Sequence, residues 1–364
     1  MVTGRRPRTR TARLAANIAA AFVAAGLVVA AGCSLVTSYD GYYGASASTC
    51  GKRVPERPEI TAGGKGGTEL VGAMTALRFL DPPDAAPLGF DLDKLCTCPD
   101  RRACANPKAA DQQCDVPNTG IDNAAGSILN LLFPPQADAL LQESLRHGRN
   151  GIVVRVQGWD GTPDDSDVSV SIYNVVGLQG DEEGGAPAMF NGNDGFIVDD
   201  DSLLQVANLG PRFFDTSAYV TKGTLVASLD YDFRIEVPNA LDASSVVFIP
   251  LRSARLVGKI EKVGASGLSL TSAQFVGRLP VGQIFQQLSG IGLCRDGGTY
   301  AQVKTNLCAS LDLPQKPASD GKDVPCDALS FAIGVKVAPA RIGGHAAKPA
   351  SPSPCGDEPV DTCQ

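Results

Sequence analysis

The segments "SARLVGKI" (residues 253–260) and "SAQFVGRL" (residues 272–279) repeat one pattern at an offset of 19 residues. In both, Ala, Leu or Phe, Gly, and Ile or Leu occupy alternate positions, and Arg or Gln, Val, and Lys or Arg lie between them. A period of two places successive side chains on opposite faces of a strand. Because the glycine-containing turn sequence "GASG" (264–267) lies between the two copies, we expect them to pair as adjacent antiparallel strands.

The same period of two continues on both sides of this pair. "VSVSIY" (168–173) and "LDYDFRIEV" (229–237) alternate hydrophobic and polar residues, whereas "SSVVFIPL" (244–251) is more uniformly hydrophobic. Two further strands are expected in "TELVGAMTALRFL" (68–80) and "LSFAIGVKVAPARI" (329–342). A sheet with one hydrophobic face must bury it against another layer. We therefore predict a mainly β protein, an antiparallel β-sandwich of jelly-roll type.

A few peripheral helices are expected around this sheet. The first runs from about Gln136 to Gly148, with an apolar stripe at spacings of three and four residues. A second begins after Pro280 and ends near Gly290, and a third covers 300–309. "NTGIDNAAGSILNLLF" (118–133) reads as the capped start of another helix, with Asp122 or Asn123 as the cap.

The N-terminal region carries a targeting signal. The first 14 residues contain five arginines and no acid, and Leu14–Gly32 follows without a charge. This order is typical of a signal peptide, with a spanning helix as the alternative. Ala30-Ala31-Gly32-Cys33 resembles the lipobox of bacterial lipoproteins, in which cleavage occurs before a cysteine that is then acylated. The resemblance implies a signal peptide over 1–32 and a lipid on Cys33, and ordinary secretion is the competing interpretation.

The residue after the cysteine bears on the destination. It is Ser34 rather than Asp, and the resemblance to Gram-negative lipoproteins then implies sorting to the outer membrane, facing the periplasm or the cell surface. "GFDLDKLCTC" (89–98), "GIDNAAG" (120–126) and "CDALSFAIG" (326–334) together resemble predicted lipoproteins of myxobacteria and their relatives. This second resemblance covers most of the mature chain. It implies a location and no particular activity.

Cysteine usage agrees with export. Ten cysteines remain beside Cys33, in two groups of five: Cys50, Cys96, Cys98, Cys104 and Cys114, then Cys294, Cys308, Cys326, Cys355 and Cys363. In an exported chain this predicts a disulfide framework rather than a metal centre, because "CTCPDRRAC" lacks paired zinc-ligand spacing. Since each group is odd in number, complete pairing within the chain requires at least one disulfide between the groups.

These features divide the chain into four parts. After the signal peptide we expect a flexible tether over 33–67, a β-sandwich domain over 68–342 with a cysteine-rich loop at 96–114, and an irregular cysteine-containing tail over 343–364. Removing residues 1–32 takes away five arginines and no acid, which changes the formal net charge from −7 to −12. An acidic protein of this kind is a poor partner for nucleic acid.

The sequence contains no Gly-x-Ser-x-Gly, His-Glu-x-x-His or Walker motif. We therefore expect no catalytic residues and no resident cofactor. Two acidic loops are the one candidate for metal chemistry, because oxygen ligands on glycine-rich turns suit Ca²⁺. The residues are Asp160, Asp164, Asp165, Asp167, Asn193 and Asp194. The competing interpretation is that Asp-Gly and Asn-Gly form turns.

Trp159, the single tryptophan, adjoins the first acidic loop. It is a candidate for stacking on a sugar ring, with packing in the core as the alternative. Two functions follow. The first is a membrane-anchored, exported, non-enzymatic lipoprotein with a structural or interaction role and a glycan or protein partner. The second is a calcium-assisted carbohydrate-binding module.

Overall fold

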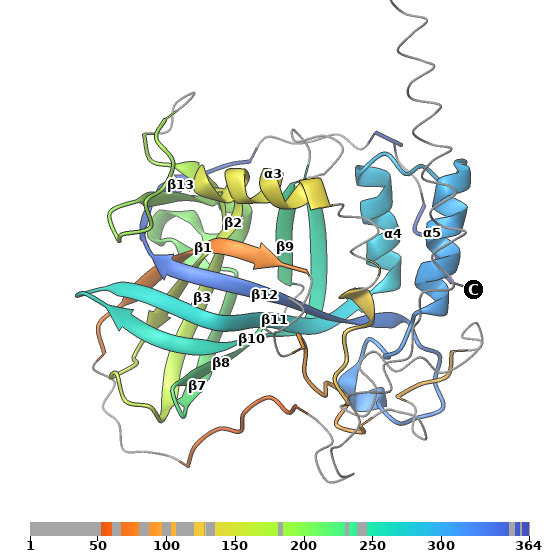
Figure 1. Ribbon diagram of the computed structural model, residues 1–364, viewed down its shortest axis with the longest axis horizontal. Helices are drawn as coiled ribbons and strands as arrows, with labels where there is room; N and C mark the ends of the chain where they lie inside the picture. The colour runs from red at the N-terminus through yellow and green to blue at the C-terminus, as the bar shows by residue number, and fades with distance from the viewer. Residues whose placement is uncertain are drawn as a thin grey trace, which may run out of the picture. The chain divides into compact units, whose positions relative to one another are not determined.

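The repeated pattern forms a long hairpin. In the computed structural model, β10 (Val246–Val263) and β11 (Gly267–Pro280) pair antiparallel, with Val263 opposite Gly267 at the turn (Figure 1). Ala254, Leu256 and Ile260 point into the core, as do their counterparts Ala273, Phe275 and Leu279. The predicted hairpin and its hydrophobic face are confirmed. The expected strand at 244–251 is not separate, because it forms the first part of β10.

The structure describes residues 52–59, 67–79, 87–96, 103–106, 120–126, 128, 135–180, 185–229, 233–238, 246–348, 354–356 and 359–363. The predicted signal peptide, Cys33 and three more of the cysteines, Cys50, Cys98 and Cys114, lie outside these residues. Residues Cys50–Gln364 form one unit.

Eight antiparallel strands close into a ring. The order is β3-β2-β1-β12-β11-β10-β8-β7, and β7 pairs back to β3. The other six strands are β1 (Leu70–Arg78), β2 (Arg149–Gln157), β3 (Asp165–Leu178), β7 (Phe213–Thr221), β8 (Thr224–Leu229) and β12 (Ala328–Pro339). The mainly β, disulfide-stabilised fold is confirmed. Because these strands share one sheet that closes on itself, the structure does not confirm two stacked sheets of jelly-roll type.

Alternate residues from all eight strands fill the interior of the closed sheet. Typical examples are Val168, Val170 and Ile172 of β3, which are fully buried in the main core. β9 (Phe233–Pro238) continues from the end of β8 and pairs with the first part of β10. Its Phe233 packs against Phe275 and Phe213, with ring centroids 5.2 and 5.3 Å apart, and so covers one end of the interior.

Short strands and helices complete the unit. β13 (Arg341–Ala346) pairs parallel to β4 (Gly195–Asp199), and β5 (Leu203–Gln205) pairs with β6 (Gly210–Pro211). The helices are α3 (Pro135–Arg146), which lies across the sheet beside β2 and β9, and the neighbouring α4 (Val281–Gly290) and α5 (Gly298–Ala309) (Figure 1). All three match their predicted positions. Among the described residues, no helix is both long and apolar enough to cross a bilayer.

Part of the predicted tether is bound to the sheet. The Tyr219 hydroxyl donates a hydrogen bond to the carbonyl oxygen of Pro55 at 2.5 Å. The Arg57 guanidinium lies 4.8 Å from the Tyr219 ring and donates to the carbonyl oxygens of Ser166 and Ser217. Val54 packs on the outer hydrophobic face. The tether prediction for 33–67 is therefore wrong for residues 52–59, because a short apolar and basic segment finds partners on the outer face of the strands.

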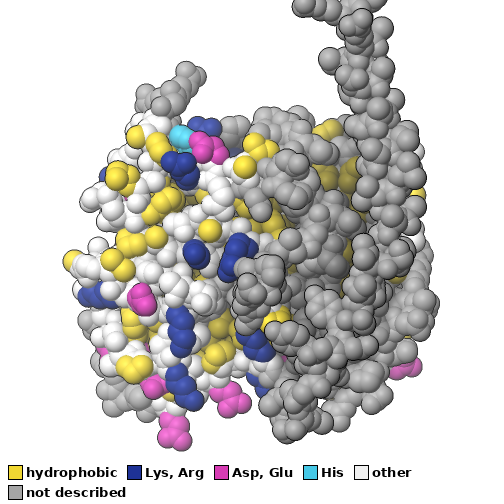
Figure 2. All heavy atoms as spheres, in the orientation of Figure 1, with side chains coloured by type: hydrophobic (Ala, Val, Ile, Leu, Met, Phe, Trp, Pro, Cys, Tyr) yellow, Lys and Arg dark blue, Asp and Glu magenta, His cyan; other side chains and the backbone are white. Residues whose placement is uncertain are grey.

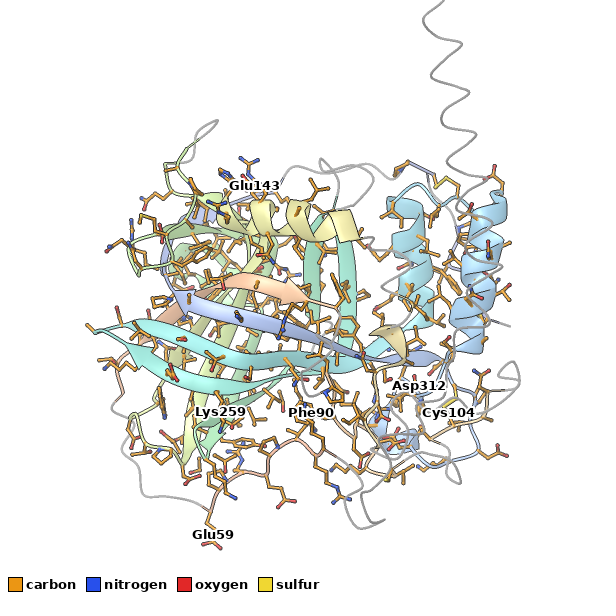
Figure 3. The ribbon with its side chains drawn as sticks, in the orientation of Figure 1. Glu59, Phe90, Cys104, Glu143, Lys259 and Asp312 are labelled. Carbon is orange, nitrogen blue, oxygen red and sulfur yellow. A yellow bond between two sulfur atoms is a disulfide. The ribbon has the colours of Figure 1, made fainter. Side chains whose placement is uncertain are left out.

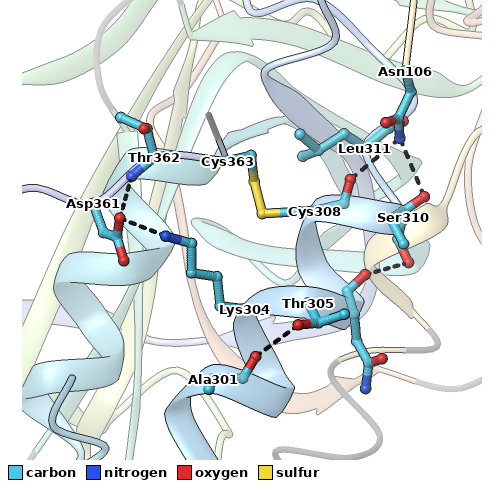
Figure 4. The surroundings of a disulfide bond; sticks show 12 residues. Asn106, Ala301, Lys304, Thr305, Cys308, Ser310, Leu311, Asp361, Thr362 and Cys363 are labelled. Atoms are coloured by element: carbon cyan, nitrogen blue, oxygen red, sulfur yellow. Dashed lines mark hydrogen bonds and ion pairs between the residues drawn. A yellow bond between two sulfur atoms is a disulfide. The ribbon is translucent and has the colours of Figure 1, made fainter. Parts of the chain in front are cut away.

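The C-terminal tail is also bound. Residues 341–346 form β13, and Cys363 is bonded to Cys308 of α5 (Figure 4). Burial opposes ionisation of Asp361, but hydrogen bonds from Lys304 Nζ at 2.7 Å and from the Tyr300 hydroxyl outweigh it and lower the pKa of Asp361 to about 2. The irregular-tail prediction is thus wrong for 343–346, which form part of β13.

Three disulfides are described, and one joins the two cysteine groups. Cys104–Cys326 spans 222 residues, whereas Cys294–Cys355 and Cys308–Cys363 span 61 and 55. The prediction of a disulfide between the groups is confirmed. The bonded segments are also paired along their backbones, because the amide of Ala105 donates to Val324 and that of Cys326 donates to Ala105. This disulfide between the two cysteine groups, called the crossing disulfide below, therefore fixes residues 103–106 beside the start of β12.

The length of this loop predicts how much it stabilises the fold. In the chain-entropy model, a disulfide closing 222 residues contributes about 5 kcal/mol and one closing 61 residues about 4 kcal/mol. We expect the double variant Cys104→Ala/Cys326→Ala to lose more free energy of unfolding in urea than the matched variant Cys294→Ala/Cys355→Ala. An equal or smaller loss would show that loop length does not govern this bond.

Candidate functional site

The candidate site lies on the outer face of the closed sheet. Leu88 and Phe90 pack there on Val226, Val257 and Val276, which face away from the interior. Figure 3 labels Phe90, which lies beside the strands β10 and β11. Besides residues 52–59, the covering chain comes from two segments, 87–96 and 120–126, which are separated by 23 residues in sequence. They meet where the amide of Asp122 donates to the Phe90 carbonyl oxygen at 3.1 Å.

Hydrogen bonds to β11 and β12 hold both covering segments in place. The Gln274 side chain accepts from the Gly89 amide at 2.8 Å, and the Ser330 hydroxyl accepts from the Ala124 amide at 2.7 Å. The Asn123 side chain accepts from the Ala332 amide at 2.9 Å. Asn123, expected as a helix cap, therefore binds the neighbouring strand. Both segments are thus held by residues of β11 and β12 whose neighbours along each strand pack in the core.

This arrangement brings three buried carboxylates together. Asp91, Asp93 and Asp122 are 4%, 5% and 4% exposed, and one ligand atom from each lies within 4.8 Å of the others. Among the described residues this is the one group of three or more His, Cys, Asp or Glu side chains that meets this distance. An Asp122 oxygen accepts from the Leu92 amide at 2.6 Å, and an Asp93 oxygen accepts from the Leu95 amide at 2.7 Å.

Several oxygens of the cluster have no hydrogen-bond donor among the described residues. They are both carboxylate oxygens of Asp91 and Oδ2 of Asp93, all three buried. The Arg53 Nε lies 3.9 Å from Asp91 Oδ2, on a side chain that is 64% exposed. Burial is the largest cause that raises the pKa of Asp93, to about 6, and the neighbouring Asp91 and Asp320 raise it further against the Leu95 amide. The site thus gathers three carboxylates in a small buried volume.

A pocket of about 340 Å³ adjoins the cluster and shares Asp93 with it. Three cations line it: Lys94, Arg255 and Arg278. Arg278, 2% exposed, forms a bidentate pair with Asp320 at 2.7 and 2.6 Å and donates to the Pro314 carbonyl oxygen. Lys94 and Arg255 have no ion-pair partner among the described residues. Their charges are therefore available to an anionic group in the pocket.

The first predicted calcium loop is a set of turns. Asp160 accepts from the amide and hydroxyl of Thr162 at 2.8 and 2.6 Å, and these hydrogen bonds lower its pKa. Asp165 accepts from the amides of Asp160 and Asp167, and Asp164 accepts from the Lys222 amide at 2.8 Å. Asp167 faces solvent. These carboxylates satisfy backbone amides of turns, as in the competing interpretation.

The second predicted loop has the same role. Asp194 accepts from the Phe190 amide at 2.6 Å, and the Asn193 carbonyl oxygen accepts from Arg341 Nε at 2.8 Å. The loop is thereby joined to β13. Asp194 and the acids of the first loop are not part of the described acidic cluster of Asp91, Asp93 and Asp122.

Trp159 is part of the main core. It is 8% exposed, and its indole nitrogen donates to the Thr162 carbonyl oxygen at 2.8 Å. This burial favours core packing over stacking on a sugar ring. Core packing, the alternative, is what the structure shows.

The cluster residues were not singled out as ligands from the sequence, although they lie in two segments quoted for their resemblance, "GFDLDKLCTC" and "GIDNAAG". The one local signal is Asp-x-Asp at 91–93, which also occurs in ordinary turns. Comparison with protein-family models, with curated proteins and with solved structures finds no match to this chain.

Gly89 makes the close approach of the two covering segments possible. Its φ is +116°, and a Cβ there would lie 2.7 Å from Ile121 Cγ2 and 2.9 Å from the Asp122 carbonyl oxygen. We expect Gly89→Ala to lower the free energy of unfolding by about 3 kcal/mol, from backbone strain and overpacking together. Gly264→Ala is the matched control, since Gly264 also has positive φ but open space around it. Urea unfolding compares them, and an equal cost would contradict the steric argument.

Proposed function

We propose that this chain is an exported, lipid-anchored protein of the cell envelope whose folded domain is a non-enzymatic interaction module. The observation that carries the proposal is the Cys104–Cys326 disulfide together with the two that bind the chain end. Disulfides of this structural kind persist in oxidising compartments such as the bacterial periplasm. The basic and apolar N-terminus with its Gly32-Cys33 sequence supports the same location.

The lipid is the expected means of membrane attachment. Each buried methylene contributes about 0.8 kcal/mol, so several acyl chains on Cys33 hold a protein that one chain would hold only marginally. The folded unit begins near residue 52, which leaves about 18 residues between the anchor and the first described contact. We expect a segment of this length to let the module meet partners near the membrane surface.

The pocket beside Asp93 is the surface that we propose for partner binding. It offers the charges of Lys94 and Arg255 on a rigid base formed by β10 and β11. On the face shown in Figure 2, further Lys and Arg side chains lie at intervals between hydrophobic and uncharged ones. A chain with a formal charge of −7 thus presents basic groups locally. An anionic group on a protein or glycan partner fits this arrangement.

Acylation provides the direct test of the location. We expect Cys33→Ser to leave the protein uncleaved or soluble, whereas Ser34→Ala retains the cysteine and remains acylated and membrane-bound. Cell fractionation and intact mass spectrometry of the N-terminus measure both. A wild-type protein with an unmodified N-terminus at another residue would refute the lipid anchor.

A calcium-assisted carbohydrate-binding module is the second candidate. The observation that favours it is the shared position of Asp93, which belongs both to the acidic cluster and to the pocket with Arg255. A sugar bearing a carboxylate suits these cations better than a neutral sugar. We expect Arg255→Gln to abolish binding to uronate-containing glycans on an array, with the exposed Lys259→Gln as the control. Absence of glycan binding by the wild type would contradict this second candidate, and the non-enzymatic interaction module would remain.

A further inference from the structure

We propose that Asp91, Asp93 and Asp122 form a Ca²⁺ site on the outer face of the closed sheet. The site does not depend on lipid anchoring, because all its elements belong to the folded unit. Three observations support the site: the separation of the three carboxylates, their burial, and the oxygens that have no hydrogen-bond donor among the described residues.

The separations match a single ion. Ca²⁺ lies 2.3–2.6 Å from its oxygen ligands, so two ligands on opposite sides of it are about 5 Å apart and neighbouring ligands are closer. One ligand atom from each of the three aspartates lies within 4.8 Å of the others. An ion among them therefore reaches all three without a rearrangement of the backbone.

The burial of Asp91 is the independent observation. Its side chain is 0% exposed, and neither of its oxygens has a hydrogen-bond donor among the described residues. A buried carboxylate without a donor is costly, and a buried charge requires a partner or a metal. Arg53, whose side chain is mostly exposed, lies 3.9 Å away and offsets only part of the charge of Asp91. A divalent cation supplies the missing compensation at the point where the unsatisfied oxygens meet.

The chemistry of the donors selects the ion. All three ligands are hard carboxylate oxygens, without imidazole or thiolate, and such a set suits Ca²⁺, Mg²⁺ or Mn²⁺ over zinc or copper. Mg²⁺ needs near-ideal octahedral geometry at 2.0–2.1 Å and keeps several waters, so it seldom occupies a buried site of several carboxylates. Ca²⁺ tolerates irregular geometry and six to eight oxygens. Second carboxylate oxygens, carbonyl oxygens and water would complete its shell.

The site is largely pre-formed by the backbone. The amides of Leu92 and Asp93 both point to Asp122 Oδ2, at 2.6 and 3.4 Å, and join the two ligand segments. The Gly89 and Ala124 amides bind β11 and β12 as described above. An ion held by Asp91 and Asp93 on one segment and Asp122 on the other would cross-link them. Calcium is thus expected to stabilise the cover over the outer face.

The first measurement uses calcium alone on the full-length protein with its disulfides intact. After treatment with chelator, we expect calorimetric titration to give one Ca²⁺ per chain and thermal unfolding to shift upward in millimolar CaCl₂, since a ligand specific for the native state raises its stability. MgCl₂ at the same concentration should give a much smaller shift. No binding and no shift with calcium would overturn the proposal, and an equal response to magnesium would overturn the choice of ion.

Isosteric variants separate a metal site from an acidic cluster that is merely structural. We expect Asp91→Asn and Asp122→Asn each to weaken calcium binding at least tenfold. Without calcium, Asp91→Asn should unfold at the same or a higher temperature than the wild type, because it removes an uncompensated charge. With calcium, Asp91→Asn should unfold at a lower temperature than the wild type. A variant that unfolds earlier by the same amount with and without calcium would show that Asp91 is structural and would overturn the proposal.

The control variant tests the location. Asp164→Asn changes an acid of the loop at 160–167 whose oxygen accepts a backbone amide, and it should retain full calcium affinity. Loss of calcium binding in Asp164→Asn, with binding kept in Asp91→Asn, would place the ion in that loop instead. Acylation of Cys33 is measured separately, so failure of the calcium site leaves the proposed envelope location standing, and the reverse also holds.

Discussion

The pairing of β3 with β7 is the constraint on which the rest of the structure depends. Without it the sheet would end in two open edges with unsatisfied backbone groups and a half-covered hydrophobic face. With it, Asp165 lies opposite Val220 and Ile172 opposite Phe213, and the eight strands close. Closure gives the chain an interior that alternate residues must fill and an exterior on which other segments can pack. The hydrophobic clusters at Val226, Val257 and Val276, which face outward, therefore require a cover.

The candidate site is a consequence of that requirement. A continuous outer face between β8 and β12 is covered by segments from three distant parts of the chain, which join where the Asp91 amide donates to Lys52 and the Asp122 amide to Phe90. The three carboxylates lie where two covering segments meet, so the sheet and the neighbouring segment both shield them from solvent. The acids are thus placed by the packing of Leu88 and Phe90 on the sheet, whereas Asp160, Asp165 and Asp194 accept backbone amides within their own loops.

The sequence predicts the elements better than their assembly. The period of two identified β10 and β11 with the correct inward face, and cysteine parity required a bond such as Cys104–Cys326. Closure could not be predicted, because the β3–β7 pairing joins residues some 50 positions apart and leaves no local pattern. Ser253 and Ser272, which open the two repeated segments, both have positive φ at interruptions of the strand register. A serine in the sequence does not indicate a positive φ, as a glycine would. Asp91 and Asp122 could not be distinguished from other acids, since their burial depends on contacts distant in sequence.

The cluster and the crossing disulfide are linked through one network. Asp320 pairs with buried Arg278 and contributes to the raised pKa of Asp93, and the next residue, Gly321, donates its amide to the Ala103 carbonyl oxygen beside Cys104. Cys96, which ends the segment of Asp91 and Asp93, is itself disulfide-bonded. Like charges that are buried together repel one another and would separate in a yielding structure. Covalent bonds on the flanking segments resist that separation, so the carboxylates stay close before any ion arrives. Less reorganisation is then required on binding, and preorganisation of this kind increases affinity.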